Sequence, residues 1–190
     1  GIKDLLPWEE RKRKSERYRF RKDRYRCIAA GALLKKMLTD EGVKDFEVVR
    51  DEHGKPRLKN YTKLHFNISH SGDYAVCALG DSPVGVDIES LGSADLKVAG
   101  RFFTEGEYEW IMKKDAEERF IRIWTLKESY VKYKGQGLGL SFRKFEIIPD
   151  EKKPEDAFFE EYNLEGYCLS LCKSGGDRVR PEKISFKYNI

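Results

Sequence analysis

The stretch that decides how the chain divides reads Pro83-Val84-Gly85-Val86-Asp87-Ile88-Glu89-Ser90-Leu91-Gly92-Ser93. Its first part predicts a strand from Pro83 to Glu89, because apolar and acidic side chains alternate along it. After the strand, Ser93 is a candidate cap for a helix that reaches Phe102. The chain therefore changes from strands back to helices near residues 90–93.

The segment before this stretch begins with a helix and continues with strands. Asp23 is a candidate cap for a helix from Arg24 to about Thr39, whose apolar side chains recur at helical spacing. A turn is expected at residues 51–56. Strands are predicted at 46–50, 65–68 and 74–79.

The segment after it repeats the same order. Thr104-x-x-Glu107 has the form of a capping box, and Asp115 opens a long helix that ends near Gly135. Strands are predicted at 142–148, 167–172 and 184–188. We therefore expect an α+β fold with two similar halves, residues 1–90 and 91–190. The halves should lie in a pseudo-twofold arrangement, with the active site in the cleft between them.

Composition excludes several classes of protein. The 190 residues are 37% charged, and no apolar run approaches the roughly 18 residues of a membrane span. The four cysteines fit reduced thiols, and Cys168-x3-Cys172 has no second Cys or His pair nearby for zinc. With no signal peptide in view, we expect a cytoplasmic protein that does not bind a membrane.

Basic residues are concentrated near the start of the chain. Residues 11–26 hold ten Lys and Arg against Glu16 and Asp23, a balance of +8, whereas the whole chain is +4. A basic block on an otherwise acidic body predicts an anionic partner, which could be a nucleic acid, a phosphorylated small molecule or an acidic protein. A solvated helix face is the alternative.

Three polar segments suggest chemistry. Asp87 and Glu89 are two residues apart on a predicted strand and so share one face, although an edge strand with a solvated acidic face would look the same. On the long helix, Trp124, Glu128 and Lys132 recur every four residues, as surface pairs also do. His70 lies where a strand meets a Gly turn, a common place for a structural histidine.

Together the three segments form a plausible site. Three carboxylates supply the hard oxygen ligands that Mg²⁺ prefers, while His70, Lys132 and the basic block would balance a di- or triphosphate. Without a metal, carboxylates beside a polyphosphate would repel it. We therefore expect a Mg²⁺ site, with Mn²⁺ as an alternative ion.

At this point the chain resembles the 4′-phosphopantetheinyl transferase family, in its single-chain, two-halved type that activates carrier proteins. The resemblance covers roughly residues 11–138. It is carried, in matching order and spacing, by Gly54-Lys55-Pro56, Phe66-Asn67-Ile68-Ser69-His70-Ser71, Gly85-Val86-Asp87-Ile88-Glu89, Arg101-Phe102-Phe103-Thr104-x-x-Glu107, Trp124-x-x-Lys127-Glu128-Ser129-x-x-Lys132 and Gly135-x-Gly137-Leu138.

The resemblance implies a role for each matching residue. Asp87, Glu89 and Glu128 take the positions of Mg²⁺ ligands, and Glu128 is also the candidate base for the carrier serine. Lys132 and His70 would contact the phosphates of coenzyme A and act in catalysis. The remaining expected coenzyme A contacts are Ser69, Lys55, Pro56, Lys14, Arg17 and Arg26.

The resemblance also implies the reaction and its partners. The phosphopantetheine of coenzyme A would pass to a serine of an apo acyl or peptidyl carrier protein, and adenosine 3′,5′-bisphosphate would leave. Phe102, Phe103 and residues 108–112 lie near the expected docking surface for the carrier. We expect a monomer, since both halves are in one chain.

Three other functions are compatible with some of these features. A nucleic-acid-binding module could use the basic block with Tyr18, Phe20 and Tyr25, but it has no use for the three carboxylates. We therefore expect no nucleic-acid partner. A metal-dependent phosphohydrolase would act on coenzyme A without a carrier, and a catalytically silent interaction domain would not turn over at all.

Overall fold

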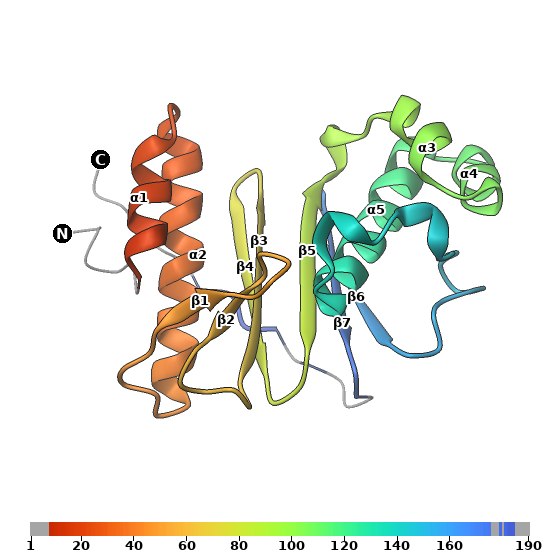
Figure 1. The fold of residues 1–190 in the computed structure, drawn as a ribbon. Helices are drawn as coiled ribbons and strands as arrows, with labels where there is room; N and C mark the ends of the chain where they lie inside the picture. Colours follow the sequence, from red (N-terminus) through yellow and green to blue (C-terminus); the bar gives the residue numbers. More distant parts are fainter. Residues whose placement is uncertain (1–7, 176–178, 180, 185–190) are drawn as a thin grey trace.

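The computed structural model describes residues 8–175, 179 and 181–184, and it has an α+β fold (Figure 1). Its N-terminal part consists of two helices and two antiparallel strand pairs. These elements are α1 (Glu9–Arg17), α2 (Arg21–Asp40), β1 (Val48–Arg50), β2 (Pro56–Leu58), β3 (His65–Ser71) and β4 (Tyr74–Gly80). Helix α2 packs on the β3–β4 hairpin and carries α1 on its outer side (Figure 1).

The C-terminal part is built around the long helix α5 and a three-stranded antiparallel sheet in the order β5-β7-β6. Its elements are β5 (Val84–Ser90), the 3₁₀ turn Leu91–Ser93, α3 (Leu96–Phe102), α4 (Glu105–Met112), α5 (Ala116–Lys134), the 3₁₀ turns Gly137–Gly139 and Phe142–Lys144, β6 (Phe158–Leu164) and β7 (Tyr167–Lys173). Each part thus sets one long helix against a β-hairpin. The predicted boundary between the two halves at residue 90 stays a prediction. Strand β5, which precedes that boundary, pairs with β7 of the C-terminal part.

The two parts meet where β3 runs beside β5. Among the described residues these strands belong to separate sheets, and side chains of β3 bridge them. The Val86 amide donates to Asn67 Oδ1 at 2.8 Å, and the Ser90 amide donates to Ser71 Oγ at 3.2 Å. We call this line of contact the seam. It brings polar side chains of both parts together at one place.

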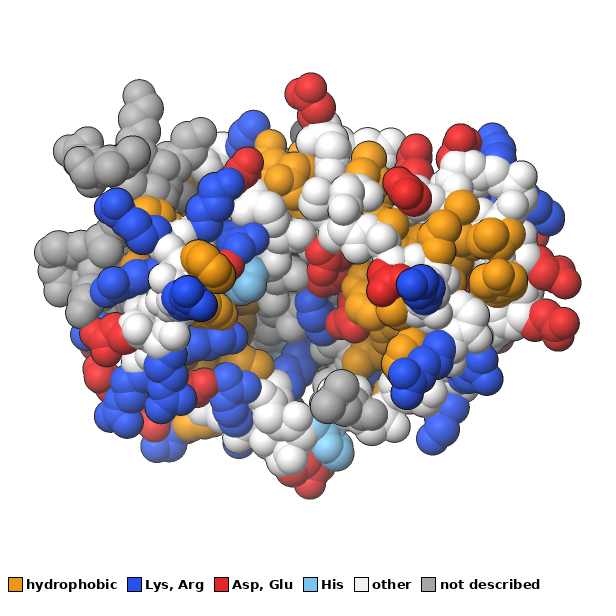
Figure 2. All heavy atoms as spheres, turned by 90° about the horizontal axis from the view of Figure 1, so that it is seen from above, with side chains coloured by type: hydrophobic (Ala, Val, Ile, Leu, Met, Phe, Trp, Pro, Cys, Tyr) orange, Lys and Arg blue, Asp and Glu red, His pale blue; other side chains and the backbone are white. Residues whose placement is uncertain are grey.

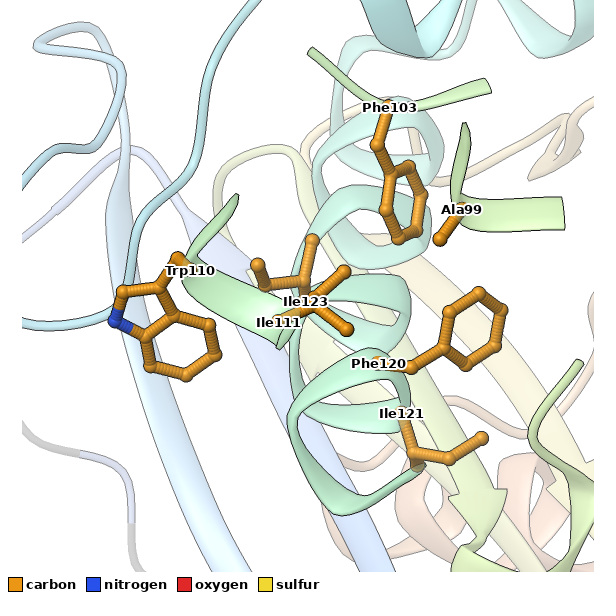
Figure 3. Close-up of a cluster of buried hydrophobic side chains, with 7 residues drawn as sticks. All are labelled: Ala99, Phe103, Trp110, Ile111, Phe120, Ile121 and Ile123. Atoms are coloured by element: carbon orange, nitrogen blue, oxygen red, sulfur yellow. The ribbon is translucent and has the colours of Figure 1, made fainter. Parts of the chain in front are cut away.

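Apolar side chains hold the two parts together beside the seam. Val86 and Ile88 of β5 are buried with Leu169 and Leu171 of β7, and side chains of β4 pack against them. A second cluster joins α3, α4 and α5 (Figure 3). It comprises Ala99, Phe103, Trp110, Ile111, Phe120, Ile121 and Ile123. Burial of about 1.5–3 kcal/mol per large apolar side chain makes these clusters the main source of stability.

A buried ion pair joins α4 to α5. Lys127 Nζ lies 2.5 Å from Glu107 Oε1, and neither side chain is exposed to solvent. Lys127 also donates to the carbonyls of Phe142 and Phe145, at 2.8 and 2.7 Å. Glu107 completes the capping box with Thr104, as the sequence predicts.

Two predicted caps and one predicted strand are wrong. Helix α2 begins at Arg21 with Phe20 at its cap, so Asp23 lies inside the first turn. Ser93 lies in a 3₁₀ turn, and Asp95 caps α3 by accepting from the Lys97 amide. Residues 142–148 form no strand, because their backbone groups bind Lys127 and Glu107 in place of a neighbouring strand.

The other strands agree with prediction in part. The strand predicted at 46–50 is limited to Val48–Arg50, whereas those at 65–68, 74–79 and 167–172 are confirmed with small extensions. Strand β6 was not predicted. Most of the strand predicted at 184–188 lies outside the described residues. No helix in the described part of the chain is long and apolar enough to cross a membrane.

Candidate active site

Asp87 lies at the centre of the seam and is 2% exposed, which excludes the solvated edge strand. Its Oδ1 accepts from Ser69 Oγ at 2.8 Å and lies 2.5 Å from Lys132 Nζ. Its Oδ2 is buried and has no hydrogen-bond partner among the residues that the structure describes. A buried carboxylate oxygen without a partner is costly, so this atom marks a place where a ligand is expected.

Helix α5 brings Glu128 and Lys132 to Asp87. The helix lies against β5 at Gly85, where a Cβ atom would be 2.0 Å from the Ser129 carbonyl oxygen. Only glycine permits so close an approach. Lys132 Nζ reaches across the seam to Ser69 Oγ at 3.2 Å as well. Glu128, one turn before Lys132, is half-buried on the same side of the helix.

Burial raises the pKa of each of the three carboxyls. For Glu128, burial is the largest cause and the charge of Asp87 is the next. Burial also raises the pKa values of Glu89 and Asp87, although Lys132 opposes the shift at Asp87. The three charges therefore repel one another through a poorly solvated space, and a cation would relieve that repulsion.

The donor set suits Mg²⁺ in its chemistry. It offers carboxylate oxygens from β5 and α5, including the unpartnered Asp87 Oδ2. In the described ranges, however, no three His, Cys, Asp or Glu side chains are already grouped closely enough to hold an ion. The ammonium group of Lys132 pairs with Asp87, so a bound ion would compete with it for that carboxylate.

A cavity of about 300 Å³ lies on the N-terminal side of the seam, and its lining includes Ser69 and Lys132, which both contact Asp87. Lys14, Arg11, His70 and Lys132 contribute positive or polar groups to it, and Pro56 contributes an apolar wall. The remaining lining residues are Trp8, Glu10, Arg50, Phe66, Asn67, Ile68 and Ser69. Asp87, Glu89 and Glu128 are not among the described residues that line this cavity, so Ser69 and Lys132 form its link to Asp87. A cationic cavity next to a carboxylate fits a phosphorylated ligand with a metal beside it.

His70 is surrounded by cations. Burial lowers its pKa, and the charges of Arg11, Arg26 and Lys14 lower it further. A backbone hydrogen bond opposes this shift in pKa, and the net effect favours the neutral imidazole in the free protein. A bound phosphate would reverse the sign of the local field and favour the protonated form.

The structure brings most of the predicted site residues together. Asp87, Glu89 and Glu128 interact electrostatically, and Ser69 and Lys132 both contact Asp87. Arg26 is paired with Asp23 and acts electrostatically on both His70 and Glu89.

Three predicted contacts are not among the described residues that line the cavity. Arg17 is exposed in the last turn of α1, and Arg26 pairs with Asp23. Lys55 is likewise absent from that lining, and its ammonium group instead meets backbone carbonyls of α5 and β5. All three stay predictions as coenzyme A contacts.

Sequence reasoning missed Trp8 and the individual role of Arg11. Arg11 lies in the basic block, but only the packing of α1 on α2 shows that it faces inward, donating to the Cys27 carbonyl at 2.8 Å. Trp8 lies 6.3 Å from Phe66, centroid to centroid, at the mouth of the cavity. Its position just before the basic helix α1 was a sequence signal that could have marked Trp8 as a site residue.

The surface around the site is asymmetric (Figure 2). Lys and Arg side chains gather on the side of α1 and α2, and hydrophobic side chains gather on the side of α3 and α4 (Figure 2). The exposed hydrophobic residues there are Phe102, Tyr108 and Met112, at 44%, 39% and 49% exposure. An apolar surface next to a charged site is suited to binding a protein partner.

Two protein families match consecutive segments of this chain. Residues 2–81 match the N-terminal domain of 4′-phosphopantetheinyl transferase, and residues 83–175 match the 4′-phosphopantetheinyl transferase superfamily. The boundary between the matches falls between β4 and β5, next to the seam.

Several curated proteins are similar in sequence to most of this chain. The 4′-phosphopantetheinyl transferase Sfp of Bacillus subtilis is 30% identical in an alignment 186 residues long, which covers 88% of this chain and 82% of that protein. The 4′-phosphopantetheinyl transferase gsp of Aneurinibacillus migulanus is 34% identical in an alignment 179 residues long, which covers 86% of this chain and 75% of that protein. Among solved structures, the holo-[acyl-carrier-protein] synthase of Thermotoga maritima matches 48% of this chain and 62% of its own, at 25% identity and a TM-score of 0.42.

The site combines a cationic cavity with the buried Asp87, and the matching family models and relatives define the chain as a transferase. The chain belongs to the 4′-phosphopantetheinyl transferase superfamily and is an enzyme of the Sfp type.

Proposed function

We propose that this enzyme transfers the 4′-phosphopantetheine group of coenzyme A to a serine hydroxyl of an apo acyl or peptidyl carrier protein. The reaction would require Mg²⁺ or Mn²⁺ and would release adenosine 3′,5′-bisphosphate. The observation that carries this proposal is Asp87, whose buried Oδ2 has no hydrogen-bond partner among the described residues and whose Oδ1 contacts Ser69 and Lys132 of the cationic cavity. That arrangement accommodates a phosphate-rich molecule only if a cation lies between the two.

Coenzyme A would bind with its nucleotide in the cavity on the N-terminal side of the seam. Lys14 and Arg11 lie where they would meet phosphate groups, and Pro56 lies where an apolar wall would face the base. His70 and Lys132 lie at the inner end of the cavity, where the diphosphate would reach the carboxylates. Charge-assisted hydrogen bonds from these groups would orient the diphosphate.

Asp87, Glu89 and Glu128 would hold the metal. When bound, the ion supplies charge neutralisation for the diphosphate and makes its phosphorus a better electrophile. The pKa values of all three carboxyls are raised without an ion, so bringing a cation among them should be favourable.

The protein's own groups would manage the proton and the leaving group. Glu128 would accept the hydroxyl proton of the carrier serine as a general base. The serine oxygen would form its bond to the phosphorus on the pantetheine side as the bond to the bridging oxygen breaks. Lys132 and His70 would stabilise the charge that grows on the departing nucleotide phosphate.

The carrier would dock across the apolar surface of α3 and α4. Phe102, Tyr108 and Met112 are exposed there, on the side of the seam away from the basic helices. Carrier proteins are typically acidic, so the basic side would also steer their approach, and that effect should weaken with salt. Since one chain supplies every proposed site residue, we propose that a monomer is active.

Mass spectrometry tests the reaction directly. Incubation of an apo carrier with the enzyme, coenzyme A and Mg²⁺ should add one phosphopantetheine group to the carrier serine. Glu128→Gln should abolish that addition, and an exposed change such as Lys36→Gln should not.

Two parallel measurements test the other functions. Release of phosphate from coenzyme A without a carrier would indicate a phosphohydrolase. Tight binding of an oligonucleotide with none of coenzyme A would indicate a nucleic-acid-binding module, and either result without carrier modification would overturn the proposal.

A further inference from the structure

Lys55 connects the N-terminal part of the molecule to the catalytic helix. Its Nζ donates to the Lys132 carbonyl at 2.5 Å and to the Tyr133 carbonyl at 3.4 Å, in the last turn of α5. It donates at 3.2 Å to the Val84 carbonyl, at the start of β5. One ammonium group therefore joins a loop, a helix and a strand that are distant in the sequence.

Two of the three carbonyls, those of Lys132 and Tyr133, lie in the last turn of α5 and need a donor. The last carbonyls of an α-helix have no partner within the helix, and they carry the negative end of its dipole. Val84 lies three residues before Asp87 on β5, and Lys132 itself lies in the last turn of α5. The ammonium group of Lys55 thus fixes the distance between the strand that carries Asp87 and the helix that carries Glu128 and Lys132.

The loop that presents Lys55 is firmly shaped. Asp51 Oδ1 accepts from the backbone amides of His53 and Lys55, at 3.0 and 2.8 Å. The Asp51 amide donates to the Lys55 carbonyl at 3.0 Å, which closes the turn. Gly54 adopts φ +83°, a conformation that glycine adopts without strain. The side chain of Lys55 therefore leaves the loop from a fixed position.

We propose that Lys55 is a positioning residue that holds α5 against β5, so that Lys132 and Glu128 face Asp87 correctly. It acts through backbone carbonyls, and its ammonium group does not itself bind the nucleotide. The inference rests on the proposed roles of Asp87, Glu128 and Lys132 in transfer.

The test separates positioning from nucleotide binding. In Lys55→Met, kcat for carrier modification should fall on the order of 10- to 100-fold, because small displacements of reacting groups have effects of that size. The Kd for adenosine 3′,5′-bisphosphate, measured by calorimetry, should stay within about twofold of the wild-type value. A rise in that Kd with an unchanged kcat would assign Lys55 to nucleotide binding and overturn the proposal, as would no change in either.

Two further variants guard the interpretation. Lys59→Met is the matched control, because Lys59 follows β2, is 55% exposed and pairs with Glu47. Lys55→Arg keeps the charge and should recover part of the lost kcat. If Lys55→Met does not fold, the kcat of Lys55→Arg decides, since a wild-type kcat with a raised nucleotide Kd would contradict positioning. Failure of Lys132→Ala and Glu128→Gln to slow transfer would instead refute the proposed function itself.

Discussion

Helix α5 carries two lysines that each lie 2.5 Å from a buried carboxylate, and the two pairs differ in how completely they are satisfied. Lys127 and Glu107 are fully buried, and Lys127 is further surrounded by two carbonyls and the Phe145 ring, whose centroid is 4.1 Å away. Lys132 is 26% exposed, and one buried oxygen of its partner Asp87 has no hydrogen-bond partner in the described part of the chain.

The difference separates a structural pair from a functional one. Both oxygens of Glu107 are used, because Oε1 also accepts from the Ile147 amide and Oε2 accepts from the Thr104 amide. Nothing is left there for a ligand. The pair of Lys132 and Asp87 is incomplete and Lys132 lines a cavity, so binding of a ligand can complete the pair. Changes to the two pairs should therefore affect different properties.

The largest effect is expected at the incomplete pair. Asp87→Ala should lower the rate of carrier modification by about 10³-fold or more, because it removes a proposed metal ligand. The urea midpoint should stay near the wild-type value, since the change removes an unpartnered buried oxygen. Steady-state kinetics and urea denaturation measure the two effects. A variant that retains transfer within about tenfold of wild type, with Mg²⁺ present, would contradict the assignment of Asp87.

Breaking the complete pair should affect stability. Lys127→Met leaves Glu107 buried without its counter-charge and should lower the free energy of unfolding by about 3–5 kcal/mol. The double variant with Glu107→Gln should recover part of that loss, which would reveal the coupling between the two residues. Urea denaturation measures both variants. A loss below about 1 kcal/mol would show that this pair is no more structural than an exposed one.

The approach of α5 to β5 should have a smaller effect on both properties. In Gly85→Ala, the new Cβ would meet the backbone of Ser129 and Tyr133, so the helix must shift. Such overpacking should cost about 1–3 kcal/mol and also slow transfer by moving Lys132 and Glu128. Gly139→Ala is the matched control, because nothing lies within 4 Å of its added Cβ. Equal melting temperatures for the two variants would argue against the close approach.

The smallest expected effect concerns the cavity that the incomplete pair faces. Lys14→Ala should weaken coenzyme A binding about 3- to 5-fold at low salt, and the loss should shrink as salt is added. Arg13→Ala is the control, because Arg13 is 70% exposed and pairs with Glu9 on α1. Calorimetry at two salt concentrations measures the effect. A loss that does not change with salt would indicate a packing role for Lys14.

Sequence patterns predicted the parts of the fold that are local. The capping box at Thr104, the helix end at Gly135 and the strands around His70 and Asp87 all depend on nearby residues. The strand prediction for residues 142–148 was wrong because the backbone groups of this segment bind Lys127 and Glu107, which come from other elements. Such contacts leave no periodic signal.

The candidate site, too, could be predicted from the sequence only where it depends on local spacing or on family resemblance. The spacing of Asp87 with Glu89 and of Glu128 with Lys132 placed each pair on one face, and resemblance to a family joined the two pairs. Neither the residue spacing nor the family resemblance could show that Lys55 bonds to carbonyls of α5, or that Arg11 faces inward while Arg17 is exposed. Those facts depend on how α1 packs on α2 and how α5 lies on β5.

The central claim is that carboxylates from β5 and α5 share one divalent ion next to coenzyme A. Titration of the enzyme with Mn²⁺ in the presence of coenzyme A, followed by electron paramagnetic resonance, tests it most directly. The account predicts one tight site per chain, weakened in each of Asp87→Asn, Glu89→Gln and Glu128→Gln. Mn²⁺ binding that is unchanged in all three variants would contradict it.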